Sequence, residues 1–277
     1  MPRTVPLLSA TGIVSLIPAS SSVPFPSTVS APLPSAPASL IDTVALPLIK
    51  VVPLRVLAAL SAILPGPATV SGAGTVSIPF ANANYTGTWE LDSGTLRIGN
   101  PLALGSLSTP INFAGGTFEL NNISYGNNIT VPDGGTLRGT GTSTFAGAIT
   151  VAPSSSVTIS SGVTGAETFT IGDASHHLTG GAGSTIHIIG GGRVDLPFDG
   201  SGYAGDFAVD AGILRVSVGT ATSGGTSPIV INSGATLEIN NVNWGRDLTM
   251  NDGSTLRGNA AQEKSSFAPD AESWRRL

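Results

Sequence analysis

The sequence predicts an all-β solenoid, a stack of strand-and-turn coils that are each about 20 residues long. Gly (36 residues) and Pro (20) are abundant and aromatic residues make up only 5% of the chain. Such a composition does not favour a wide aromatic core, but it allows thin layers of Val, Ile and Leu between Gly turns. A long segment occurs twice, and a shorter period with alternating apolar and polar residues runs inside it. This combination is typical of repeat architectures built from strands.

The long repeat places two copies of one unit in the chain, at residues 72–189 and, incompletely, at 190–258. Gly74–Phe80 and Gly192–Phe198 are alike and lie 118 residues apart. After one inserted residue the offset becomes 119, as in Asp133–Gly139 and Asp252–Gly258. We therefore treat residues at these offsets as equivalent.

The shorter period is marked by a Gly or Ser, usually followed by Thr, that leads into an aliphatic residue or Phe. Successive steps of 19 to 29 residues separate Leu96, Phe118, Leu137, Val157, Ile186, Leu214, Leu237 and Leu256. A step near 20 is the length of one solenoid coil, and the wider steps of 29 and 28 predict coils with a longer loop.

Within one coil the residues alternate with a period of two. Phe118 and Leu120 are expected on the buried face of a strand and Glu119 on the opposite face. Gly-Gly, Asp-Gly and Asn-Asn steps supply the turn conformations at the corners. One coil cannot be stable alone, because ordering its backbone costs more free energy than its few aliphatic residues return. Neighbouring coils must therefore stack on it.

The segments outside the repeat differ from it. Residues 1–48 are rich in Pro, Ser and Ala, which predicts a disordered leader, or alternatively a start site assigned too early. In residues 49–68, Lys50 and Arg55 precede an apolar run at 56–64, and small residues follow. This order is typical of a secretory signal peptide, and a chance apolar run is the alternative. Residues 259–277 form an irregular tail without a counterpart in the first unit, so we expect a fragment or a shifted reading frame.

Charge and cysteine content limit the function classes. The net charge is −5 and the chain contains only two lysines, so we expect no nucleic-acid partner, since such binding needs clustered Lys and Arg. Without cysteine there is no disulfide framework and no thiolate zinc site.

The segment from Gly74 through Tyr85-Thr-Gly87 and Gly94-Thr-Leu96 to Leu102-Ala-Leu-Gly105 resembles the autotransporter-associated β-strand repeat. The resemblance extends over about residues 72–258, although the second copy lacks the Ala-Leu-Gly turn. It implies a right-handed parallel β-helix carried on the passenger of a secreted or cell-surface protein, associated with the outer membrane of a Gram-negative-type bacterium. Neither amphipathic strands for a membrane barrel nor a sorting motif is recognisable, which leaves the mode of anchoring open.

Some β-helix proteins cleave polysaccharides, and we considered that alternative. Glycoside hydrolysis needs two carboxyl groups at a set separation, but the acids here mostly follow the repeat; Asp133 and Asp252, for example, open equivalent turns. His176, His177 and His187 are the only histidines, and with Asp173 or Asp195 they could form a metal site. They lie in a Gly-rich stretch, which favours a solvated loop instead. Gly190–Asp195 faintly resembles a calcium-binding repeat but occurs once. We expect no catalytic residue, no metal and no cofactor.

Tyr125 and Trp244 are equivalent aromatic residues, as are Trp89 and Phe207. An aromatic residue repeated on a coil surface could stack on a sugar ring, and packing in the core or at a corner is the alternative. The sequence thus predicts a non-enzymatic structural or adhesive passenger segment, with a carbohydrate-binding or carbohydrate-active β-helix as the alternative. Its expected partners are host or cell-surface glycans or proteins. Open solenoid edges are also expected to permit end-to-end self-association.

Overall fold

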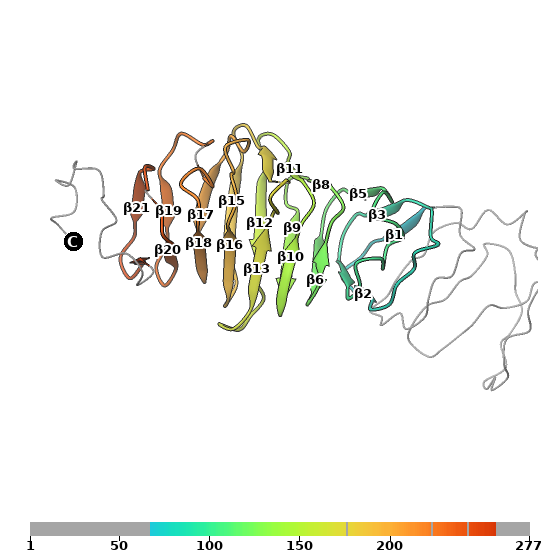
Figure 1. Ribbon diagram of the computed structural model, residues 1–277. Helices are drawn as coiled ribbons and strands as arrows, with labels where there is room; N and C mark the ends of the chain where they lie inside the picture. The colour runs from blue at the N-terminus through green and yellow to red at the C-terminus, as the bar shows by residue number, and fades with distance from the viewer. Residues whose placement is uncertain (1–66, 176, 223, 243, 259–277) are drawn as a thin grey trace, which may run out of the picture.

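Strands form where the sequence alternates apolar and polar residues. The structure is a computed structural model that describes residues 67–175, 177–222, 224–242 and 244–258. Within these ranges the secondary structure consists of 22 strands and turns without a helix, and each strand pairs in parallel with a strand about one coil away. The predicted parallel β-solenoid is confirmed, and Figure 1 shows its strands side by side along the axis.

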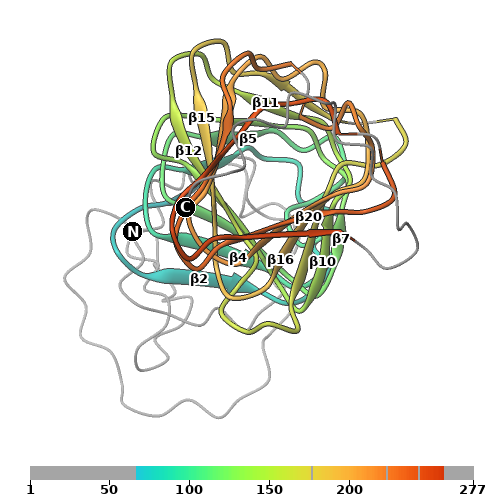
Figure 2. The ribbon, with the colours of Figure 1, turned by 90° about the vertical axis from the view of Figure 1, so that its left-hand side faces the viewer.

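Three faces surround the solenoid axis, as the end view in Figure 2 shows. The long face contains nine strands: β2 (Thr75–Ile78), β4 (Thr95–Ile98), β6 (Thr117–Asn121), β9 (Thr136–Thr140), β12 (Ser156–Ser160), β15 (Thr185–Ile189), β17 (Asp206–Val209), β19 (Ile229–Ile231) and β21 (Leu248–Met250). The seven-stranded face contains β7 (Ser124–Tyr125), β10 (Thr142–Phe145), β13 (Thr168–Ile171), β16 (Arg193–Leu196), β18 (Ile213–Val216), β20 (Thr236–Ile239) and β22 (Thr255–Gly258).

The third side, which we call the split face, consists of two short sheets that are in contact through β5 and β8. One sheet contains β1 (Ala68–Val70), β3 (Trp89–Leu91) and β5 (Ile111–Phe113), and the other contains β8 (Ile129–Val131), β11 (Ile149–Val151) and β14 (Leu178–Gly180). Where strands form on all three faces, as in β8, β9 and β10, the chain winds from the split face to the long face and then to the seven-stranded face.

The core is a single apolar column inside the three faces. Each strand contributes alternate side chains to it, as Leu96 and Ile98 do from β4. A cluster of three aromatic rings lies near its middle, where Phe118 packs edge-on against Tyr125 and Phe145 with centroids 5.4 and 6.4 Å apart. All three side chains are at most 1% exposed.

The two copies of the long repeat lie on different faces. β2 starts the first copy on the long face, whereas its equivalent β16 lies on the seven-stranded face. In the same way β3 on the split face corresponds to β17 on the long face, and β9 on the long face corresponds to β22. From β2 the chain makes five coils to reach β15 and then advances one more face to β16. The second unit is therefore turned by one face relative to the first.

This turn corrects one reading of the short period. The 29-residue step from Val157 to Ile186 is a single coil with a longer loop, as predicted, because the two residues pair across β12 and β15. The 28-residue step from Ile186 to Leu214 is not a coil. Ile186 pairs with Phe207 on the long face, while Leu214 belongs to the seven-stranded face. That step therefore consists of one ordinary coil, from Ile186 to Phe207, and the short segment that leads on to Leu214 on the next face.

Corner turns use the residues that tolerate a positive φ. Asn122 and Asn241 are equivalent and have φ values of 56° and 60°, which confirms that the Asn-Asn steps supply left-handed corners. Gly94 has a φ of 75°, and a Cβ there would lie 2.4 Å from the carbonyl oxygen of Gly72. Successive corners thus stack too closely for any side chain at this position.

The Pro-rich leader, nearly all of the signal-like segment and the tail at 259–277 lie outside the described residues. Ala68, which the sequence assigns to the signal-like segment, is the first residue of β1 and pairs with Trp89. Within the described ranges, no helix is long and apolar enough to cross a membrane.

Candidate functional site

Three charged side chains from three successive coils form a ladder on the long face. Glu119 lies between Arg97 and Arg138, and strand register places the three residues side by side. Arg97 Nε is 2.6 Å from Glu119 Oε1, and Arg138 Nε donates to Glu119 Oε2 at 2.8 Å. Although Glu119 points away from the core, the two arginines cover it and leave only 4% of the residue exposed. We call this set the first ladder.

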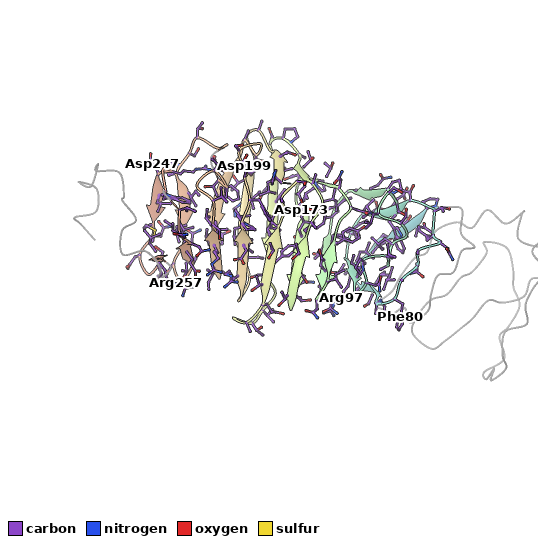
Figure 3. All side chains as sticks on the ribbon, viewed as in Figure 1. Phe80, Arg97, Asp173, Asp199, Asp247 and Arg257 are labelled. Carbon is purple, nitrogen blue, oxygen red and sulfur yellow. The ribbon has the colours of Figure 1, made fainter. Side chains whose placement is uncertain are left out.

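An equivalent ladder recurs on the seven-stranded face. Arg215 Nε lies 2.6 Å from Glu238 Oε1, and Arg257 pairs with Glu238 Oε2 from the next coil. Glu238 is 5% exposed. Arg97 and Arg257 lie on widely separated coils in Figure 3, with Arg257 near the C-terminal end of the described stack. We call this set the second ladder, and its different face follows from the turn between the two units.

In both ladders the ion pairs join side chains from neighbouring coils. A carboxylate with guanidinium groups above and below it is favourably placed only if the three coils keep their register. The remaining arginines of residues 67–258 are also paired with acids: Arg193 with Asp195 at 2.6 Å, and Arg246 with Asp206 at 3.1 Å. All six arginines in the described ranges are thus engaged within the solenoid.

The two acids of the second unit that face Arg215 have pKa values shifted in opposite directions. Burial raises the pKa of Asp195, and the hydrogen bond and charge of Arg193 only partly oppose this effect. Burial also acts to raise the pKa of Glu238, but the hydrogen bond from Arg257 and the charge of Arg215 outweigh it and hold the pKa below its ordinary value. Two carboxyl groups whose pKa values are shifted in opposite directions are a feature of the acid–base pairs of glycosidases. Here, however, strand register places Arg215 between the two acids, where a substrate would have to enter.

Glu238 should make the stability of the protein sensitive to acid. Because folding lowers its pKa, the ionised carboxylate stabilises the fold fully above its ordinary pKa of 4.5, and the contribution is lost as the pH falls through the lower folded pKa. We expect Glu238→Gln to lose less free energy of unfolding than the wild type does between pH 6 and pH 3. Urea denaturation at a series of pH values measures this difference.

The matched control for this prediction is Asp247→Asn. Asp247 is exposed and forms no ion pair with another described residue, so its replacement should leave the steeper wild-type profile unchanged. Equal pH profiles for Glu238→Gln and the wild type would show that the second ladder is not a source of acid sensitivity.

The structure places the two candidate stacking aromatics in the core. Tyr125 is 1% exposed and lies edge-on to Phe118 and Phe145, at 5.4 and 5.8 Å between centroids. Trp244 is 8% exposed and donates its Nε1 hydrogen to the carbonyl oxygen of Arg246 at 2.5 Å. Neither ring offers a face to a sugar, so their geometry is that of the packing alternative. Trp89 and Phe207 are likewise buried.

The two histidines within the described residues, His177 and His187, have different neighbours. His176 lies outside the described residues. His187 Nδ1 lies 2.6 Å from Asp210 Oδ2 on the long face, and Asn232 Nδ2 donates to the other oxygen of that carboxylate at 2.6 Å. His177 instead contacts Phe198 beside a cavity of about 10 Å³, room for about one water molecule. Residues 67–258, apart from the three gaps, contain no group of three potential metal ligands.

Other acids hold turns and loops. Asp133 Oδ1 accepts a hydrogen bond from the Ser156 backbone N–H in the next coil at 2.8 Å. Glu167 accepts from the N–H groups of Val163 and Thr164 at 2.6 and 2.7 Å, which closes the long loop after β12. The Gly-rich stretch before Asp195 packs on that loop, since Gly191 N donates to Gly162 O. These contacts give the two acids and the Gly-rich stretch a structural role, which is to hold turns and loops in place.

The ladders are the feature that sequence reasoning missed. Arg97, Glu119 and Arg138 are separated by 22 and 19 residues, which are coil spacings, and the same order of charges recurs at Arg215, Glu238 and Arg257. Opposite charges that recur at the coil length in both copies of the unit would have been enough to predict the two ladders.

No family model matches the chain, and the searches of curated proteins and of solved structures found no significant similarity. The β-solenoid fold thus stands on the strand pairing alone.

Proposed function

We propose that this chain is a structural or adhesive passenger segment of an exported bacterial protein, located at the cell surface or secreted, with no catalytic centre. The observation that supports it most is the unbroken parallel stack, from β2 to β21 on the long face. A stack of this kind grows only along its axis, so it extends a chain away from an anchoring point while exposing long flat faces.

The use of charged groups agrees with a scaffold rather than an enzyme. The arginines in the described ranges are paired with acids between or within coils, which leaves none of them free to bind a phosphate or position a substrate. The acids with opposed pKa shifts, Asp195 and Glu238, are separated by Arg215. Surface glycans or proteins remain the proposed partners, through the outer faces.

Export can be tested on the full chain in a Gram-negative host. Deleting the apolar run at 56–64 should retain the protein in the cytoplasm, because that run is the proposed signal core. The matched control deletes nine residues of the Pro-rich leader instead, at 30–38, and should still be exported. Fractionation with an antibody against the solenoid measures both, and equal cytoplasmic retention of the two variants would contradict the proposal.

Adhesion and catalysis predict different results with polysaccharides and cells. Surfaces coated with the full chain should retain cells or glycans, and surfaces coated with heat-unfolded chain should not. Incubation with a panel of polysaccharides should release no reducing ends over time. A time-dependent release that is lost in Asp195→Asn would replace the scaffold proposal with the carbohydrate-active alternative.

A further inference from the structure

Strand β1 begins where the signal-like segment meets the repeated units. The apolar run at 56–64, which is the proposed signal core, ends shortly before Ala68, and the first repeated unit begins at residue 72. Peptidases that remove export signals cut after a small residue that has another small residue two positions before it. Gly66-Pro67-Ala68 and Ser71-Gly72-Ala73 both have this form. The sequence therefore offers two places at which a leader can be removed.

The first of these places lies inside a paired and buried strand. The N–H of Ala68 donates to Thr88 O at 2.8 Å, and Thr69 Oγ1 donates to Glu90 Oε2 at 3.0 Å. Ala68, Thr69 and Val70 are at most 7% exposed. A peptidase must hold the bond that it cuts, and the residues beside it, in its own active site. It therefore cannot reach the Ala68–Thr69 bond unless β1 first leaves the stack.

The second place lies in the exposed corner between β1 and β2, where both Gly72 and Ala73 are exposed. A cut after Ala73 would detach the whole of β1 from the stack. Trp89 and Leu91 of β3, which are at most 2% exposed, would lose the strand that pairs with them. The hydrogen bond from Gly72 N to Ser93 Oγ at 2.7 Å would also be lost. The first coil therefore depends on residues that this cut would remove.

A cut after Ala68 keeps most of the contacts of the first coil. Thr69 and Val70 stay opposite their partners in β3, and Val70 O still accepts a hydrogen bond from Asp92 N at 2.9 Å. The cut removes Ala68 and with it the hydrogen bond to Thr88 O. Of the two places, only this one removes the signal-like segment and leaves a paired strand at the start of the solenoid.

We propose that the peptidase of the export pathway cuts the chain between Ala68 and Thr69, and that it does so before the chain folds. Water adds across the peptide bond, so that the carbonyl carbon of Ala68 gains the hydroxyl group and the nitrogen of Thr69 gains the proton. At neutral pH the two products carry a new carboxylate and a new ammonium group. The inference rests on the export proposed above and adds the site and the timing of the cut.

Folding ends the period in which this bond can be cut, because pairing of β1 with β3 buries it. Two forms of the protein are therefore expected. A chain that is exported while unfolded starts at Thr69, and a chain that folds in the cytoplasm retains residues 1–68. The length of the chain thus records whether export or folding came first.

The first residue of the exported chain tests the position of the cut. The full chain is expressed in a Gram-negative host, and intact mass and N-terminal sequencing are measured on the exported and cytoplasmic fractions. The exported form should start at Thr69, and the cytoplasmic form should retain the leader. An exported form that starts at Gly74, or that keeps the leader, would overturn this inference but not export itself. No exported form at all would overturn both proposals.

Substitutions at the two places separate them. Ala68→Leu puts a bulky side chain beside the bond and should reduce the cut form about tenfold, whereas Ala68→Ser keeps a small side chain and should be cut like the wild type. The matched control is Ala73→Leu in the exposed corner, which should also be cut normally. The readout is the mass of the denatured chain, so it does not require the variants to fold. A reduction in Ala73→Leu that equals or exceeds the one in Ala68→Leu would overturn the inference.

The order of cutting and folding is tested on the full chain, purified in its folded form from the cytoplasm and incubated with detergent-solubilised export peptidase. The folded wild type should resist, and so should Phe80→Ala, whose side chain is 55% exposed. Trp89→Ala removes the buried ring opposite Ala68 and should be cut several-fold faster, because cutting of a folded chain follows the population of its opened form. Wild type that is cut as fast as a peptide of residues 60–76, or no faster cutting in Trp89→Ala, would overturn the proposed order.

Discussion

Replacing Phe118 with Ala is expected to lower the free energy of unfolding by about 3–5 kcal/mol, the range for a large aromatic residue in a packed core. The Phe118 ring is 1% exposed and holds two other rings, Tyr125 and Phe145, in edge-on contact. Coils on both sides fill the space around the cluster, so a cavity there cannot collapse without shifting the stack. Urea denaturation followed by circular dichroism measures the loss.

Phe80→Ala is the matched control, because the Phe80 side chain is 55% exposed at a corner of the same solenoid (Figure 3). Its replacement should change the free energy of unfolding by less than about 0.5 kcal/mol. A similar loss for Phe80→Ala and Phe118→Ala would contradict the position of Phe118 at the centre of the core.

Gly139→Ala should destabilise the fold by about 1–3 kcal/mol, whereas the equivalent change Gly258→Ala should be nearly neutral. At Gly139 the added methyl group would lie 2.4 Å from the Phe169 ring, which must move against a full core. At Gly258 the same methyl group would meet no described atom within 4 Å. Thermal and urea denaturation of the two variants in dilute solution measure the difference.

The two glycines occupy the same place in nearly identical strands, Thr136-Leu-Arg-Gly139 and Thr255-Leu-Arg-Gly258. Intrinsic strand propensity is therefore the same in both, and only the covering coil differs. An equal loss in both variants would mean that the effect arises from the strand itself and not from the contact with Phe169.

The fold could be predicted from the sequence because its main determinant is local. Alternation around Phe118 and Leu120 specifies a strand with one buried side, and recurrence at the coil length specifies the stack. The turn of the second unit could not be predicted in this way. It depends on how many residues each corner and loop contains, and a spacing of 28 residues fits one long coil as well as one coil plus a face.

The roles of individual polar and aromatic side chains were harder to predict. Tyr125 and Trp244 recur at equivalent positions, but recurrence alone does not distinguish an exposed ring from a buried one. Their burial depends on the neighbouring coils that surround each ring. Glu119 was expected to face away from the core, which is correct. Its side chain is nevertheless shielded from solvent, because Arg97 and Arg138 on the two neighbouring coils pair with it. Such contacts become visible in a sequence only when residues are aligned by coil.

The rotation between units has a consequence for how the protein meets its surroundings. Equivalent residues of the two units lie on successive faces of the solenoid. The first and second ladders therefore face different directions around its axis. Three units in succession would carry a given side chain once around the circumference. Within this chain the two ladders therefore present equivalent side chains on two different faces of the solenoid.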